Sequence, residues 1–284
     1  MRVFDLHCDT ASVFYKKNLP FDNNETHIRK STVGQIELTQ CFAVFFDDRK
    51  ENPRAEETLH RVVDTVFPQW NGTNVTPILT VEGGGVLATR KGWISDLAAL
   101  GCRMVGLTWN GINPLGTGAA TDDKAPLTEM GRDAVREILA RGMAVDVSHL
   151  SAKGTEEILS LTDKPIVASH SNARAVTDHV RNLSDEVASE IFRRGGLVGL
   201  NLCPFFLGSG TVTTDDAVRH AEHFLALGGE HGLALGGDWD GAPLRADMTD
   251  FSSASLLYDK FVAAFGKTIS DRIFYENAHG FFGI

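Results

Sequence analysis

The sequence lacks any run of 18 or more apolar residues, the length at which a helix begins to span a bilayer. Its first ten residues, MRVFDLHCDT, have neither an apolar core nor a small-residue cleavage site, and charges interrupt them early. We therefore expect no signal peptide and no transmembrane helix. These absences predict a cytoplasmic protein with no membrane partner.

Cysteine and positive charge are also scarce. Four cysteines are scattered along the chain without a C-x-x-C pair, which predicts reduced and mostly buried thiols (Cys8, Cys41, Cys102 and Cys203). Lysine and arginine number 27 against 37 acidic residues, giving a formal net charge of −10. This balance argues against a nucleic-acid partner and against an anionic membrane surface. The net charge does not restrict the charge of a small substrate, which could be positive or negative.

Short apolar segments recur along the chain and predict eight strands, at 3–9, 37–46, 77–84, 103–109, 143–150, 165–171, 196–202 and 233–241. Helices are predicted between them at 53–70, 127–142, 151–162, 184–196 and 214–229. No low-complexity segment or linker divides the chain, so we expect one domain over residues 1–284. Alternating strands and helices favour a parallel α/β sheet, and eight units predict a (β/α)₈ TIM-type barrel. A doubly wound open sheet is the competing architecture.

Polar side chains stand where several of these strands end, the place where barrel enzymes carry their active sites. They are His7, Asp9, Glu82, His149, His170 and Asp238. Strand alternation predicts that each shares a face with small or apolar interior residues, as His149 would with Val145 and Val147. In the first strand the same rule groups Asp5, His7 and Asp9 on one face, opposite Leu6 and Cys8.

Three histidines and three carboxylates converging on one mouth predict a metal centre, because imidazole and carboxylate together suit Zn²⁺ or a similar divalent ion. Five ligands are too many for one catalytic zinc and suit two ions sharing a carboxylate. Glu82 lies on the third strand, between the His7–Asp9 pair and the His149–His170 pair, and is the natural bridge. Asp238 would face metal-bound water and shuttle protons. Asp5 is expected to be a hydrogen-bond partner behind the ligands.

The remaining histidines are predicted to have ordinary structural roles. His220 and His223 are expected on an exposed helix face, and His27 is expected to have no convergent partner.

Taken together, the blocks "FDLHCDT", "VEGG", "LTWNGINPLGTG", "VDVSHLS", "SHSNARAV", "RNLSDE" and "GGDWDGA" resemble, in order, those of the renal (membrane) dipeptidase family of zinc metallopeptidases. The resemblance runs essentially end to end and implies a metal-dependent-hydrolase-like barrel. It implies that His7, Asp9 and Glu82 hold one zinc, and that Glu82, His149 and His170 hold the other. Mn²⁺ or Fe²⁺ can also fill such sites.

The resemblance further implies a metallodipeptidase in which a metal-bridging hydroxide attacks the amide carbonyl of a dipeptide. Glu82 and Asp238 would be its catalytic residues, with Asp238 accepting the water proton, contacting the substrate and passing the proton to the leaving amine. Arg181 matches the family arginine that pairs with the C-terminal carboxylate of the substrate, which its bidentate fork suits. Relatives of this family also suggest a homodimer.

The sequence departs from the family at Trp109, where well-known members carry a histidine that contributes to the substrate site and to oxyanion stabilisation. Trp109 is expected to be a substrate-contacting wall, because indole can donate a hydrogen bond but cannot act as an acid or base. Two alternatives stay open: an amidohydrolase acting on N-acyl amino acids, cyclic amides or lactones, and a catalytically inactive metal-stabilised binding protein. The related amidohydrolases usually carry His-x-His on the first strand. This chain has His7-x-Asp9 there, which favours the dipeptidase over the amidohydrolase.

Overall fold

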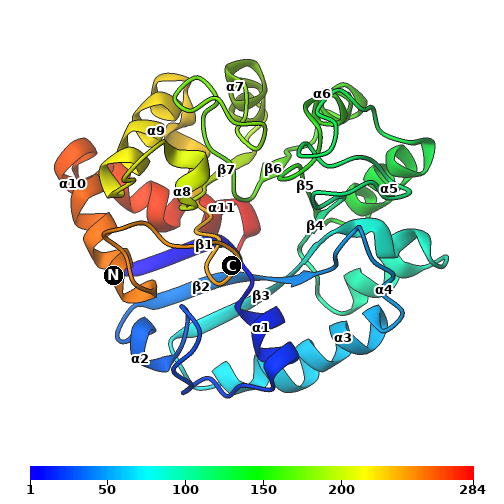
Figure 1. The fold of residues 1–284 in the computed structure, drawn as a ribbon, viewed down its shortest axis with the longest axis horizontal. Helices are drawn as coiled ribbons and strands as arrows, with labels where there is room; N and C mark the ends of the chain where they lie inside the picture. Colours follow the sequence, from blue (N-terminus) through cyan, green and yellow to red (C-terminus); the bar gives the residue numbers. More distant parts are fainter.

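A computed structural model describes all residues, 1–284, and shows eight parallel strands that close into a barrel in the order β1 to β8 (Figure 1). The strands are β1 Arg2–Cys8, β2 Glu37–Phe45, β3 Val75–Glu82, β4 Met104–Gly106, β5 Ala144–Asp146, β6 Val167–Ala168, β7 Leu197–Leu200 and β8 Leu233–Leu235. The predicted (β/α)₈ architecture is confirmed, and the open sheet is excluded because β1 pairs with both β2 and β8.

The helices are α1 Thr10–Lys17, α2 Lys30–Val33, α3 Ala55–Arg61, α4 Trp93–Ala99, α5 Glu129–Ala140, α6 Ala152–Leu161, α7 Asp185–Arg193, α8 Pro204–Leu207, α9 Thr214–Ala226, α10 Ala254–Asp271 and α11 Asn277–Phe282. Most of them surround the barrel as an outer ring, whereas α11 lies near the centre of the view in Figure 1. The five predicted helices are present, with α3 continuing through a π-helical turn and a 3₁₀ turn to Trp70. Thr128 caps α5 as predicted, because its Oγ accepts a hydrogen bond from Gly131 N.

Two apolar clusters hold these layers together. An inner cluster takes at least one side chain from every strand, and α11 adds Ala278 and Phe282 to it. A larger outer cluster packs the other faces of the strands against the surrounding helices. The inner cluster fills the barrel and α11 packs onto it, so the interior is a packed core and not a channel.

Several strands are shorter than predicted, and this overturns part of the alternation argument. β5 ends at Asp146 and its inner-cluster residue is Ala144, whereas Val145 and Val147 pack in the outer cluster. The same error occurs in β6: alternation counted back from His170 predicts Ala168 as an inner residue, whereas Val167 lies in the inner cluster and Ala168 in the outer one. His149, His170 and Asp238 all lie past the ends of their strands, where side chains no longer alternate.

Alternation is also wrong within β1. Its pairing with β2 shifts register between Asp5 and Cys8, which marks a bulge or irregularity. Leu6 therefore packs in the inner cluster and Cys8 in the outer one, instead of sharing a face.

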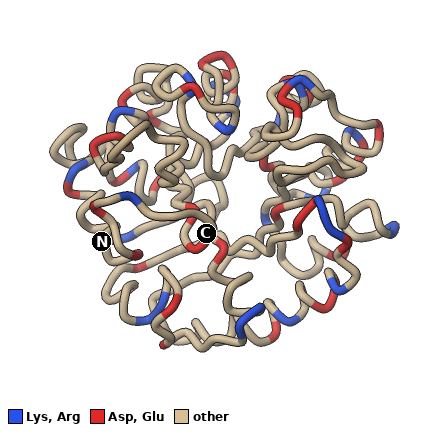
Figure 2. The backbone as a smooth tube through the Cα atoms, viewed as in Figure 1, with Lys and Arg blue, Asp and Glu red and all other residues tan.

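Figure 2 shows acidic and basic residues interspersed around the outer helices, without segregation into one large patch of a single sign. All four cysteines are buried and unpaired, as predicted. None of the helices combines the length and hydrophobicity that a bilayer crossing requires.

Candidate metal centre

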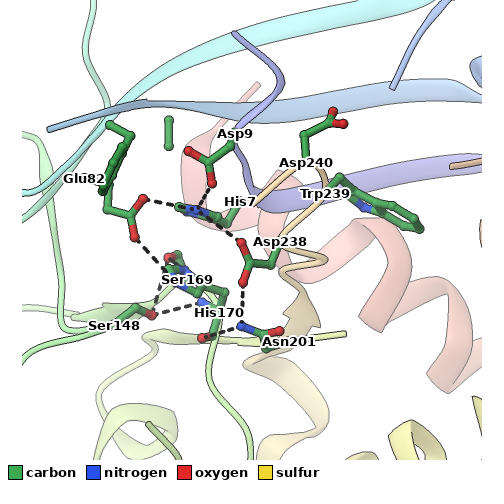
Figure 3. Close-up of polar contacts among 12 residues, drawn as sticks. His7, Asp9, Glu82, Ser148, Ser169, His170, Asn201, Asp238, Trp239 and Asp240 are labelled. Atoms are coloured by element: carbon green, nitrogen blue, oxygen red, sulfur yellow. Dashed lines mark hydrogen bonds and ion pairs between the residues drawn. The ribbon is translucent and has the colours of Figure 1, made fainter. Parts of the chain in front are cut away.

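All six predicted residues at strand ends lie together at the carboxyl-terminal mouth of the barrel, and Figure 3 labels five of them. β1 supplies His7 and is followed directly by Asp9, and β3 supplies Glu82. His149, His170 and Asp238 come from the loops after β5, β6 and β8. Parallel strands in a closed barrel end at the same rim, so residues up to 231 positions apart in the chain meet there.

Glu82 lies between two groups of potential ligands. Its Oε2 is 3.7 Å from His7 Nε2, and His7 Nε2 is 3.6 Å from an Asp9 carboxylate oxygen. Its other oxygen, Oε1, is 2.9 Å from His149 Nε2 and 3.8 Å from His170 Nε2. Each carboxylate oxygen therefore faces a different group, which is the arrangement that a bridging ligand requires.

The histidine nitrogens that face this space are available for a metal. His7 Nε2 and His170 Nε2 are buried and have no hydrogen-bond partner. Orphaned buried polar atoms are rare, so two of them in one ligand set indicate that a bound group normally satisfies them. The opposite nitrogens are occupied: His149 Nδ1 is 2.9 Å from Asn110 Oδ1, and His170 Nδ1 is 2.7 Å from Ser169 Oγ. The residues present fit a divalent ion in each of the two groups.

Burial and charge divide the histidines into two kinds. Burial lowers the pKa of His149 and of His170 well below the ordinary value, so both are neutral and ready to coordinate. Burial also acts to lower the pKa of His7, but the negative charges of Glu82, Asp9 and Asp238 outweigh it and raise that pKa to about 10. A cation is therefore favoured beside Asp9 and Glu82, and a metal ion would replace the His7 proton.

Asp146, at the end of β5, is a residue that the sequence analysis missed. Its Oδ1 accepts hydrogen bonds from Ser148 N and Ser169 N, and its Oδ2 accepts one from Ser169 Oγ at 2.5 Å. Because Ser169 Oγ also contacts His170 Nδ1, Asp146 orients this histidine through the serine. Its position could have indicated this role, because Asp146 lies two residues after Ala144, the residue of β5 that faces the barrel interior.

Asp5 lies behind the ligand cluster as a hydrogen-bond partner, as predicted, and is not itself one of the clustered ligands. Its carboxylate accepts four hydrogen bonds: from His7 N at 3.0 Å, Gln40 Nε2 at 3.1 Å, Gly237 N at 2.9 Å and Trp239 Nε1 at 3.1 Å. It thus connects the main chain at His7 to the loop that carries Asp238, without touching a ligand side chain.

The loop after β8 places Asp238 by an uncommon backbone conformation. Asp238 has φ 58° and Asp240 has φ 65°, a region that non-glycine residues rarely adopt. Asp238 N donates to His7 O at 3.0 Å, and Asp9 N donates to Trp239 O at 2.8 Å. A side chain at Gly241 would collide with the carboxylates of Asp9 and Asp238, so glycine lets this loop approach them.

Asp238 holds its two carboxylate oxygens in different surroundings. Oδ2 accepts a hydrogen bond from Asn201 Nδ2 at 3.2 Å, and Oδ1 lies 3.9 Å from His7 Nε2. Burial raises the pKa of Asp238 above its ordinary value, which suits a group that must take up a proton and release it.

The ligands open into a pocket of about 380 Å³ that is lined on one side by Phe45, Trp109 and Asn110 and on the other by Cys203, Phe205 and Phe206. A larger pocket of about 620 Å³ is lined by residues that include Gly83 and Trp93, and by none of the six strand-end residues. The chemistry therefore belongs to the smaller pocket, where metal-ligating groups converge.

Arg181 lies between β6 and α7, almost fully buried, with its guanidinium carbon 5.5 Å from the centre of the Phe206 ring. Its Nε and Nη2 have no hydrogen-bond partner. Burial lowers the pKa of Arg181, whereas the charges of Asp238 and Glu82 favour its cationic form. Two free donors beside a pocket-lining ring are suited to binding an anion.

One prediction about the other histidines is wrong. His220 is fully buried on α9 and not on an exposed face, and its Nδ1 accepts a hydrogen bond from Ala173 N at 3.1 Å. His27 has a structural role, as predicted: its Nδ1 accepts a hydrogen bond from Asp240 N at 2.9 Å while its own N donates to Asp240 Oδ1. Both histidines stabilise loops near the mouth.

Comparison with known proteins gives a consistent result. The sequence profile of the membrane dipeptidase family, peptidase family M19, matches residues 58–277. An uncharacterized dipeptidase of Schizosaccharomyces pombe is 29% identical over 246 residues, which cover 84% of this chain but only 56% of that relative. The chain thus spans little more than half the length of this curated relative.

Two solved structures share the fold. The crystal structure of the dipeptidase AC, a metallopeptidase of family M19, superposes with a TM-score of 0.86 at 24% identity, covering 99% of this chain and 98% of the other. A metallopeptidase of Rhodobacter sphaeroides, liganded with a phosphinate mimic of the dipeptide L-Ala-D-Ala, gives a TM-score of 0.83 at 23% identity. That match covers 100% of this chain and 99% of the other.

Proposed function

Because the chain belongs to the membrane dipeptidase family, peptidase family M19, we propose that it is a metallopeptidase that hydrolyses the amide bond of dipeptides. The observation that carries the proposal is Glu82, whose two oxygens face two separate groups of buried histidine and carboxylate ligands. The dipeptide mimic bound by the Rhodobacter sphaeroides metallopeptidase supports a dipeptide as the substrate class.

In this proposal two divalent ions, zinc being the ion that the ligand types suit best, occupy the mouth. One is held by His7, Asp9 and Glu82, and the other by Glu82, His149 and His170. When bound, the two ions supply an activated water and polarise the carbonyl of the scissile amide.

The protein's own groups position the substrate and move the proton. Arg181 binds the C-terminal carboxylate through its two unpaired donors. Asp238 receives the proton of the attacking water on Oδ1, since Oδ2 is held by Asn201, and delivers it to the leaving amine. A carboxylate anchor beside the ligands would favour substrates with one residue on each side of the scissile bond, which is the size of a dipeptide.

The test combines metal analysis with a substrate panel. Metal-reconstituted protein should bind close to two ions per chain and hydrolyse dipeptides faster than N-acyl amino acids or lactones. Faster hydrolysis of the latter would assign a related amidohydrolase activity. Two bound ions with no hydrolysis of any compound would indicate a metal-stabilised binding protein.

Asp238→Asn tests the proton-transfer role separately from metal binding. Asn preserves the size of the side chain and the contact with Asn201 but cannot accept the proton. We expect the variant to retain both ions and to lose about 10²–10⁴-fold in kcat. Full activity of this variant would remove Asp238 from the mechanism.

A further inference from the structure

The side of the mouth opposite Arg181 carries an aromatic corner formed by Phe45 and Trp109. Strand order runs β1 to β8 around the closed barrel, so β2, which ends at Phe45, lies across the mouth from β6 and the loop that carries Arg181, and β4 lies between them along the rim. Phe45 ends β2 and pairs with Glu82 in the β2–β3 register. Trp109 follows β4, and its ring centre is 6.2 Å from that of His149.

Neighbouring residues hold this corner in place. Phe45 meets Trp109 edge to face, with ring centres 5.0 Å apart. The guanidinium of Arg49 stacks 4.4 Å from the centre of the Trp109 ring and is itself bound to Asp47 at 2.9 Å. The main-chain N of Trp109 donates to the carboxylate of Asp48. These contacts hold the two rings together before a ligand arrives, which lowers the entropic cost of binding.

Both rings are only partly buried and contribute to the lining of the 380 Å³ pocket. A dipeptide whose carboxylate is held by Arg181 and whose amide lies over the ligands would extend its N-terminal residue across the mouth towards the end of β2, where Phe45 and Trp109 line the pocket. We propose that Phe45 and Trp109 form the subsite for the side chain of the N-terminal residue, and that they select large apolar or aromatic side chains. This inference rests on the proposed dipeptidase function.

The chemistry of the corner favours that class of side chain. Two fixed aromatic faces offer offset and edge contacts to an aromatic or aliphatic group. The guanidinium of Arg49 is already paired with Asp47, so it does not offer a free cation to an acidic side chain. Lys16 lies 5.2 Å above the Phe45 ring and is exposed to solvent. It is the basic group on this side of the pocket that could instead bind an acidic side chain of the substrate.

The experiment measures kcat/KM for dipeptides with a constant C-terminal alanine and Ala, Leu, Phe, Glu or Lys at the N-terminus. Wild-type protein should favour Phe and Leu over Ala by roughly tenfold or more. Trp109→Ala and Phe45→Ala should each reduce this ratio to near one, while Trp109→Phe, which keeps an aromatic face, should largely preserve it. Phe205→Ala, on the other side of the pocket, should leave the N-terminal preference unchanged.

The outcomes separate this inference from the function on which it rests. Hydrolysis of no dipeptide at all would overturn the proposed function. Hydrolysis with the same N-terminal preference in wild type and Trp109→Ala would overturn only the subsite. A wild-type preference for Glu that disappears in Lys16→Ala would also overturn it, because the selecting group would then be Lys16.

Discussion

Replacing Asp5 with Asn tests how the fold keeps Asp238 in register with the metal ligands. The Asp5 carboxylate is fully buried and accepts four hydrogen bonds, every one of them from an N–H group. Asn is the same size but has only one acceptor oxygen. Whichever way the amide is turned, its NH₂ group must face two N–H donors.

The cost follows from counting the lost bonds. With the amide oxygen towards His7 and Gln40, the bonds to Gly237 N and Trp239 Nε1 are lost. Two bonds to a charged acceptor are worth about 3–6 kcal/mol together. Burying a neutral amide costs less than burying a carboxylate, which offsets part of this loss. We expect a net destabilisation of about 2–4 kcal/mol, or a melting temperature about 5–10 °C lower.

The effect on turnover should be real but limited. Asp238 lies between the two donors that lose their acceptor, yet its own N still donates to His7 O, and Asp9 N still donates to Trp239 O. The loop should therefore shift by only a fraction of an ångström. We expect this shift to lower kcat about tenfold and to change KM little. Metal content should stay at the wild-type value.

Thermal unfolding, kcat, KM and metal content are measured together on Asp5→Asn and on Trp239→Phe. The Trp239→Phe variant removes one donor and replaces the buried indole with a smaller aromatic ring, so it should cost about 1–2 kcal/mol for the lost hydrogen bond plus the cost of the cavity that the smaller ring leaves. Wild-type stability of Asp5→Asn would refute the hydrogen-bond assignment. Reduced stability with unchanged kcat would show that Asp5 supports the fold without positioning Asp238.

Three further predictions address the metal ligands, the pH dependence and a helix cap. Ser169→Ala removes the link from Asp146 to His170 and should lower metal affinity about 10–100-fold in a chelator competition; unchanged affinity would contradict the link. Metal-free protein should lose stability as pH rises from 6.5 through about 10, because the folded state keeps the His7 proton that the unfolded chain releases near 6.5. Denaturation midpoints that are flat over this range would refute it. Thr128→Ala should cost about 1 kcal/mol in unfolding without changing kcat, and a large loss of activity would be inconsistent with a simple cap.

The barrel was predictable because its signals are local. Apolar segments at regular intervals, Ser and Thr caps before helices and Gly after them mark eight strand–helix units, and parallel pairing follows from their alternation. Thr128 and Gly142 bound α5 in the structure as the sequence predicts, with Gly142 at φ 77°. The position of the polar residues at strand ends followed from the architecture, without knowledge of any contact.

The orientation of those residues was not predictable by strand alternation. β5, β6 and β8 contain only three, two and three residues, so His149, His170 and Asp238 belong to loops. His149 has φ 69° and Asp238 has φ 58°, and these conformations set the direction of each side chain. The bulge in β1 likewise depends on pairing with a distant strand, and the local sequence does not encode it visibly.

These short strands explain why buried carboxylates surround the ligands. A strand of two or three residues has few ladder hydrogen bonds, and a left-handed residue beyond its end adds strain, so the loop needs further attachment. Asp5 provides it for the loops at β1 and β8, and Asp146 provides it for those at β5 and β6. Each carboxylate accepts mainly from N–H groups and leaves the ligand nitrogens free. The protein therefore fixes both halves of the mouth with carboxylates whose oxygens already accept hydrogen bonds, which keeps the ligand side chains in a preformed arrangement.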